Sequence, residues 1–404
     1  MIVKTKERAA SPPAADAVRR NGHSPGARAP AAANGAAASS SQDGSSQNGR
    51  PRVARPLAPS VRTPRLLLRR PLRRWAEEGF RRLLFLPPPL PRRIQIETTN
   101  RCNLACGMCP RDAYARPELD LSLAEFEAIL DRVPLAPHAE IIPFGWGEPL
   151  LHEDLWEIVR KAGERGFTTT LFTNGLLWGP EAIESALASG LTRVFFSLEQ
   201  TDFHAPVFFG HPNPGAIRNL RSLLQARNGK GPLVGIVGTV QAGTTGHALD
   251  LVRLGHDLGV DVVSLGRLFR EINGRLPELP RESELDLMRG LRELRKTHPM
   301  QVDVFFSRRS SGWKRVAFTA TRRLLHRANT RCPRTFDYVY VTRTGDVTPC
   351  CLHPNLALGN LHEQTLGEIW RGERFRAFRR DFRSHCGSCD IFRPSPARRS
   401  PARA

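Results

Sequence analysis

Three cysteines lie close together in the segment TTNRCNLACGMCPRD, residues 98–112. Cys102, Cys106 and Cys109 follow the spacing CxxxCxxC. Three thiolates in one loop can bind a tetrahedral metal or three corners of a four-iron, four-sulfur cube. Zinc would need a fourth ligand at comparable spacing, and the next histidine, His138, lies beyond a helical pattern. A cube held by three cysteines leaves one iron open to a small molecule. The alternative interpretations of the triplet are a zinc site and purely structural thiols.

The other five cysteines all lie after residue 330: Cys332, Cys350, Cys351, Cys386 and Cys389. Between the first two of them, the alternating run DYVYVT, a TGD turn and a second short apolar run predict a β-hairpin that brings Cys332 and Cys350 together. A helical pattern over 365–380 then leads to the motif HCGSC. Four thiolates would close this second site, which suits either a cluster or structural zinc. Cys351 is the spare thiol by spacing.

The net charge of +21 is carried by the two ends of the chain. Residues 1–93 hold 19 Lys and Arg against 5 Asp and Glu, and residues 371–404 hold 10 against 3, which leaves 31 of each sign between them. A nucleic-acid enzyme usually carries its basic surface on the folded domain. We therefore expect no specific nucleic-acid binding, and at most weak contact with an anionic membrane surface.

Composition divides the chain before any motif is considered. Residues 1–62 are rich in Ala, Pro, Ser, Gly and Arg and predict a disordered tail. Residues 63–91 predict a basic amphipathic segment that packs on the domain or lies on a membrane surface. No apolar run approaches the roughly 20 residues of a membrane span, and the N-terminus lacks the apolar core of a signal peptide. These features predict a cytoplasmic protein.

From residue 92 onward, apolar strand patterns alternate with helical patterns. The strand patterns are 93–99, 139–145, 167–173, 193–199, 233–240 and 260–266. The helical patterns are 122–133, 153–166, 180–190, 214–228 and 245–259. Ser122 and Pro180 suit helix starts, and Gly166, Gly190 and Gly259 suit helix ends. The order predicts an α/β fold, an incomplete (β/α)6 barrel of parallel strands, followed by a small C-terminal α+β domain.

Unusual residues follow four of the predicted strands. The carboxyl ends of parallel strands in such a fold lie at one edge, where catalytic groups collect. The cysteine triplet follows the first strand, GWGEPL (145–150) the second and TNG (173–175) the third, while Ser197 and Glu199 close the fourth. The sequence therefore predicts one site at this edge.

These motifs together resemble the radical S-adenosylmethionine (SAM) superfamily. The resemblance rests on TNRCNLACGMC after the first strand, on GWGEPL and on the barrel-like order, and it covers residues 92 to about 290. It implies that the open iron of a 4Fe–4S cluster chelates the amino and carboxylate groups of SAM. An electron from the cluster then cleaves the sulfonium bond and gives a 5′-deoxyadenosyl radical, while the protein supplies orientation and excludes water.

The resemblance also implies residues that bind SAM. The family's glycine-rich segment, which contacts the methionine amino group largely through backbone atoms, is matched by Gly145, Trp146, Gly147, Glu148 and Pro149. Trp146 departs from the pattern, since glycine is common at its position. Ser197 and Glu199 match a strand-4 position that often reaches the ribose, and Asn174 lies at the tip of the third strand. Arg267 is a candidate for meeting a carboxylate; turn, cap or surface roles are the alternatives for all four.

The C-terminal phrases GDVTPC and LGEIWRG resemble the truncated SPASM domain, also called twitch. The resemblance implies one auxiliary 4Fe–4S cluster, held by Cys332, Cys350, Cys386 and Cys389, with structural zinc as the alternative. Full SPASM domains carry further cysteines that this chain lacks. Cys351 is an alternate ligand, a core thiol or a hydrogen donor, because related epimerases use a free cysteine to return hydrogen to substrate.

These inferences divide the chain into a tail (1–62), a basic segment (63–91), a radical SAM barrel (92–298), an auxiliary cluster domain (299–393) and a basic tail (394–404). They predict an enzyme that abstracts hydrogen from a small polar substrate, such as a sugar or aminocyclitol, with oxidation or epimerisation as the result. A maturase of ribosomal peptides is one alternative, and an iron–sulfur electron-transfer or sensor protein is another. The family implies a flavodoxin or ferredoxin as electron donor.

Overall fold

The computed structural model describes residues 90–114, 116–136, 138–199, 214–267, 279–304, 334 and 337–386. The predicted tails (1–62 and 394–404), nearly all of the basic segment, Cys332 and Cys389 lie outside these residues. Within the described ranges, every helix is too short or too polar to span a bilayer.

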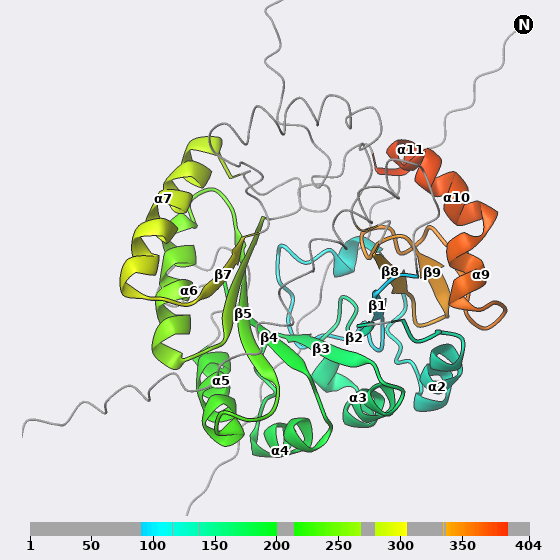
Figure 1. Cartoon of the computed structure of the whole chain (residues 1–404), viewed down its shortest axis with the longest axis horizontal. Coiled ribbons are helices and arrows are strands. Elements are labelled where there is room, and N and C mark those ends of the chain that lie inside the picture. The colour runs from blue at the N-terminus through cyan, green and yellow to red at the C-terminus, as the bar shows by residue number, and fades with distance from the viewer. Residues whose placement is uncertain are drawn as a thin grey trace, which may run out of the picture. The chain divides into compact units, whose positions relative to one another are not determined.

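One sheet runs through the described part of the chain, with the strand order β10-β9-β8-β1-β2-β3-β4-β5-β6-β7 (Figure 1). Its strands are β1 (Arg93–Ile96), β2 (Glu140–Pro143), β3 (Thr168–Thr173), β4 (Arg193–Ser197), β5 (Leu233–Val240), β6 (Val262–Arg267), β7 (Gln301–Val304), β8 (Tyr338–Val341), β9 (Asp346–Thr348) and β10 (Gly359–Asn360). Strands β1 to β7 are parallel and follow chain order. Their carboxyl ends therefore lie at one edge of the sheet.

Helices connect the parallel strands. They are α2 (Leu123–Asp131), α3 (Leu155–Glu164), α4 (Pro180–Ala188), α5 (Pro214–Arg227), α6 (Thr245–Leu258) and α7 (Arg281–Thr297), with short 3₁₀ helices η2 (Arg111–Tyr114) and η3 (Pro149–Leu151). Because right-handed crossovers between successive neighbours keep to one side of a sheet, α3 to α7 lie outside the strands (Figure 1). The predicted Ser122 cap forms a capping box, and Gly259 ends α6 with a φ of 74°.

The C-terminal part contains the hairpin β8–β9 and the helices α9 (Leu366–Arg371), α10 (Glu373–Arg380) and α11 (Phe382–Cys386). This confirms the α/β fold class and the predicted hairpin, with three differences of detail. Strand β7 adds a seventh parallel strand, Gly372 divides the helix expected over 365–380, and β8 pairs in parallel with β1. The hairpin thus extends the barrel sheet instead of forming a separate one.

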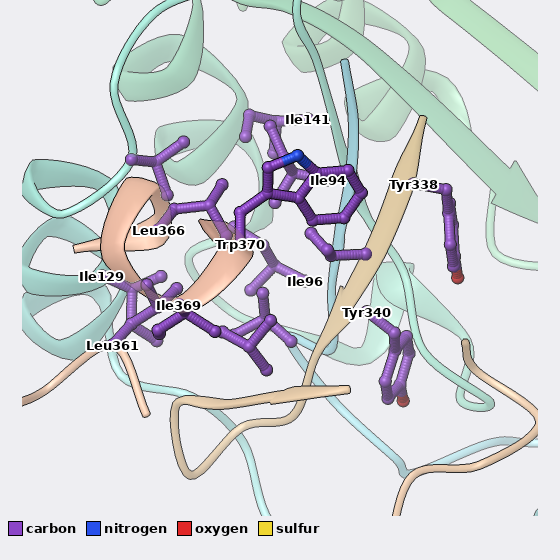
Figure 2. Packing of buried hydrophobic residues seen from close by; sticks show 14 of the residues in the cluster. Ile94, Ile96, Ile129, Ile141, Tyr338, Tyr340, Leu361, Leu366, Ile369 and Trp370 are labelled. Atoms are coloured by element: carbon purple, nitrogen blue, oxygen red, sulfur yellow. The ribbon is translucent and has the colours of Figure 1, made fainter. Parts of the chain in front are cut away.

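A shared hydrophobic core fixes this arrangement. Trp370 of α9 is fully buried in the same cluster as Ile94 and Ile96 of β1 and Ile141 of β2 (Figure 2). The guanidinium of Arg379 lies 4.2 Å from the centre of the indole ring. Consequently the C-terminal elements pack on the strand that leads into the cysteine triplet.

Candidate functional site

The cysteine triplet occupies the loop after β1, as predicted. Cys102, Cys106 and Cys109 are all partly buried, and the backbone N–H of Cys109 donates to the carbonyl of Cys106 at 2.9 Å. Burial, followed by repulsion from the other two thiols, raises the pKa of Cys106 to about 11. Burial also raises the pKa of Cys102. Three thiols close together in one loop, two of them with raised pKa values, fit a cationic metal cluster, which would neutralise the charge of the bound thiolates.

The glycine-rich loop after β2 lies directly on the cysteine loop. The backbone N–H of Glu148 donates to the carbonyl of Arg101 at 2.8 Å. A Cβ atom at Gly147 would lie 2.4 Å from that same carbonyl oxygen, and a Cβ at Gly145 would lie 2.6 Å from Cγ of Glu97. Both glycines are therefore required by close approach, and the two loops, which the sequence placed at the same edge of the sheet, are in direct contact.

The Glu148 side chain holds this loop against the end of β3. Its carboxylate is 2% exposed and accepts hydrogen bonds from Thr173 Oγ1 at 2.8 Å, the Asn174 backbone N–H at 2.8 Å and the Leu150 backbone N–H at 3.2 Å. Burial raises the pKa of Glu148 to about 7, although the three donors oppose this. Through these contacts the carboxylate fixes the position of the glycine-rich loop relative to the end of β3.

The tips of β3 and β4 meet the same edge. Asn174 Nδ2 donates to Oδ1 of Asn103, in the cysteine loop, at 2.8 Å. Ser197 ends β4 and is half-buried, and Glu199 accepts a hydrogen bond from the backbone N–H of Thr239 at 2.7 Å. Burial raises the pKa of Glu199 to about 7, and its charge helps to raise the pKa of Cys106. Asn174 thus contacts the cysteine loop directly, and Glu199 lies near enough to Cys106 to influence its pKa.

Two predicted residues have local partners. Arg267, at the end of β6, donates from Nη2 to Oε2 of Glu284 in α7 at 2.9 Å, so its charge is paired within the protein. Pro149 is buried and begins η3. The ion pair of Arg267 and the packing of Pro149 both lie outside the cysteine loop.

Sequence reasoning missed a buried ion pair beside the site. Arg116 donates to both carboxylate oxygens of Glu97 at 2.6 Å, and Glu97 is fully buried. The one signal was a charged residue directly after the apolar strand RIQI; nothing around Arg116 marked it as the partner.

The second cysteine group is described in part. Cys350, Cys351 and Cys386 are buried, and Cys332 and Cys389 lie outside the described residues. Nη1 of Arg334 lies 3.4 Å from Sγ of Cys350 and 3.5 Å from Sγ of Cys351. A hydrogen bond from Cys351, together with the charge of Arg334, lowers the pKa of Cys350, whereas that of Cys351 is raised. The lowered pKa suits Cys350 to metal binding, because the thiolate is the form of cysteine that binds metals.

Two hydrogen bonds connect the cysteine regions. The indole Nε1 of Trp146 donates to the carbonyl of Cys351 at 3.1 Å, and the hydroxyl of Tyr114 donates to the carbonyl of Leu352 at 3.1 Å. The predicted barrel site and auxiliary site are thus in direct contact through side chains of the barrel loops.

A parallel sheet with a three-cysteine loop at its carboxyl edge, next to a second buried cysteine group, defines a class of iron–sulfur proteins. Residues 96–240 match the family model for the radical SAM superfamily, and residues 332–390 match the SPASM model, described as an iron–sulfur cluster-binding domain. The chain belongs to the radical SAM superfamily and carries a SPASM domain. It is an enzyme whose cofactors are SAM, a 4Fe–4S cluster and an auxiliary iron–sulfur cluster.

Named relatives and solved structures agree with this assignment. The chain is 29% identical over 319 residues to an AdoMet-dependent heme synthase of Methanosarcina barkeri, covering 74% of this chain and 88% of that protein. It is 26% identical over 306 residues to a PqqA peptide cyclase of Xanthomonas campestris, covering 73% and 77%. The crystal structure of Streptococcus suis SuiB bound to precursor peptide SuiA has a TM-score of 0.58 at 17% identity, covering 78% and 74%, which shows a shared fold.

Proposed function

We propose that the enzyme reductively cleaves SAM and removes a hydrogen atom from a small polar substrate, such as a sugar or aminocyclitol, with oxidation or epimerisation as the outcome. One observation carries the proposal: three partly buried thiols in a single loop lie directly against a glycine-rich loop. When bound, the cluster and SAM supply the electron and the radical chemistry, and the protein supplies orientation.

Each barrel loop has a part in this proposal. Cys102, Cys106 and Cys109 would hold the cluster, and the backbone of Gly145 to Gly147 would bind the amino group of SAM. Glu148 keeps that backbone in place through its three hydrogen bonds. Polar groups of Asn174, Ser197 and Glu199 line the same edge and suit the ribose.

The C-terminal cysteines suit one auxiliary cluster. We assign Cys350 and Cys386 as ligands because both are buried, and because a hydrogen bond from Cys351 and the nearby charge of Arg334 lower the pKa of Cys350. Cys332 and Cys389 complete the set in this proposal. Cys351, whose pKa is raised by its hydrogen bond to Cys350 and by burial, is the candidate hydrogen donor if the product is an epimer.

Relatives support two classes of substrate. The name of the Methanosarcina barkeri relative indicates a small-molecule substrate, and it covers more of this chain at higher identity than the Xanthomonas campestris relative. The latter is named for a peptide, which favours a peptide maturase as the second candidate. We place the small molecule first on the similarity alone.

The test is anaerobic incubation of the reconstituted, reduced enzyme with SAM and candidate substrates. We expect 5′-deoxyadenosine from the wild-type enzyme and none from Cys102→Ala. Loss of two daltons from the substrate identifies oxidation. An unchanged mass in ordinary water, together with uptake of deuterium from heavy water, identifies epimerisation. Flavodoxin or ferredoxin should replace the chemical reductant. Iron and sulfide incorporation without any SAM cleavage would refute the proposal and indicate an electron-transfer or sensor protein.

A further inference from the structure

Two loops of the barrel site hold consecutive carbonyls of the auxiliary site. Trp146 belongs to the glycine-rich loop, and its Nε1 binds the Cys351 carbonyl at 3.1 Å. Tyr114 ends η2, five residues after Cys109, and its hydroxyl binds the Leu352 carbonyl at 3.1 Å. The ring centres of the two aromatic residues are 6.4 Å apart. Each of these hydrogen bonds joins residues more than 200 positions apart in the sequence.

The carbonyls that accept these two hydrogen bonds belong to the turn that carries Cys350. In this turn the backbone N–H of His353 donates to the Cys350 carbonyl at 2.9 Å, and the backbone N–H of Leu352 points at Cys350 Sγ at 3.5 Å. Hydrogen bonds to a cluster's sulfur atoms and orientation of its ligands tune its reduction potential. A displacement of the Trp146 indole would therefore reach the sulfur of Cys350 through one short turn.

At its other end, the indole is fixed to the loop proposed to bind SAM. Trp146 lies between Gly145 and Gly147. The backbone of Gly145 packs closely against the Glu97 side chain, and that of Gly147 against the Arg101 carbonyl. The indole is half-buried and packs on the core cluster of β1 and β8. Trp146 is part of this loop, so a ligand that displaces the loop backbone also displaces the indole. The close contacts of Gly145 and Gly147 leave the loop little space to move toward the cysteine triplet.

We propose that Trp146, assisted by Tyr114, is a positioning residue that couples occupancy of the SAM site to the reduction potential of the auxiliary cluster. This inference rests on the proposed function for its two sites. Coupling is reciprocal: a factor by which cluster reduction changes ligand affinity equals the factor by which the ligand changes cluster reduction. For one electron, a threefold factor corresponds to about 28 mV, since tenfold is about 59 mV.

The experiment is a redox titration of the auxiliary cluster in the holoenzyme, followed by electron paramagnetic resonance. The added ligand is S-adenosylhomocysteine, which lacks the sulfonium bond and so is not cleaved during the titration. We expect the ligand to shift the wild-type potential by at least about 28 mV, which corresponds to a threefold change in the equilibrium constant for reduction. Trp146→Phe, which keeps a ring but lacks the N–H, should abolish the shift at unchanged iron content, and Tyr114→Phe should reduce it.

Trp156→Phe is the matched control. Trp156 lies in α3 and packs on Trp178 at a ring-centre distance of 5.7 Å, so the variant makes the same chemical change away from both sites. It should keep the full ligand-dependent shift. A wild-type potential that ignores the ligand, a Trp146→Phe enzyme that keeps the shift, or zinc in place of the auxiliary cluster would each overturn the coupling.

Failure of the coupling is distinct from failure of the proposed function. The titration requires ligand binding and an auxiliary cluster, whereas the proposed function requires 5′-deoxyadenosine from SAM. A wild-type enzyme that cleaves SAM but shows no shift overturns the coupling alone. An enzyme that shows the shift but never cleaves SAM supports the coupling and overturns the proposed function.

Discussion

Replacing Gly147 with alanine should separate the two loops of the barrel site. The new Cβ would lie 2.4 Å from the Arg101 carbonyl oxygen and 2.7 Å from that of Thr99, whereas ordinary contact begins at 3.4 Å. One backbone must therefore move by about 1 Å, because neither atom belongs to a flexible side chain. Overpacking of this kind costs about 1–3 kcal/mol of stability, and a displacement near 1 Å at a reacting site can lower the rate about 100-fold.

The assay compares 5′-deoxyadenosine formation and iron content in Gly147→Ala and in a control, Gly163→Ala. Gly163 is exposed in α3, and a Cβ there meets nothing within 4 Å. Alanine in the helix should stabilise the protein by up to about 1 kcal/mol and leave the rate unchanged. If Gly147→Ala retained its clusters and formed product within threefold of the wild-type rate, the close-approach argument would be refuted.

Three further predictions concern stability measured by denaturant unfolding. Arg116→Met should lower the free energy of unfolding by about 3–5 kcal/mol, because it leaves the Glu97 carboxylate buried and unpaired. The double variant with Glu97→Gln should recover part of this loss. An unchanged denaturation midpoint in Arg116→Met would contradict the argument. Trp370→Ala should cost about 3–5 kcal/mol by opening a cavity in the shared core, and a loss below 1 kcal/mol would show that the core collapses around it. The folded protein raises the pKa of Glu148 from 4.5 to about 7, so the folded state binds this proton more tightly than the unfolded chain does. The free energy of unfolding should therefore fall by up to about 3 kcal/mol as pH rises from 4.5 through 7. Glu148→Gln should flatten this dependence of stability on pH, and a variant with the same dependence as the wild type would exclude Glu148 as its source.

Elements buried on both faces could be predicted from the sequence because burial leaves a local signature. All six strands expected over 93–266 are present, since each needs a continuous apolar run. The helix ends at Gly166, Gly190 and Gly259 are also confirmed, with φ values of 85°, 78° and 74° that favour glycine. The first strand is shorter than expected, because it ends at Ile96; the buried side chain of Glu97, the next residue, pairs with Arg116.

Contacts between distant segments left no such signature. Trp146 stands out in the sequence only as a departure from glycine, and its partner carbonyl, at Cys351, is a backbone atom that no residue type can announce. The same holds for Glu97 and Arg116, where the charge of each residue was visible but the pairing depends on how the loop after the cysteine triplet folds back. Motif spacing thus located the ligands, whereas the structure was needed to find what positions them.

The pairing of β8 with β1 explains why the two cysteine regions can be coupled at all. Ile96 pairs with Val341, and the ladder continues one step further because the backbone N–H of Glu97 donates to the Val341 carbonyl at 2.9 Å. A slip of one residue would turn every side chain of β8 to the opposite face and remove Val339 and Val341 from the core they share with Ile94. The position of the auxiliary turn is therefore set by strand register, which places the Cys351 carbonyl 3.1 Å from Nε1 of Trp146.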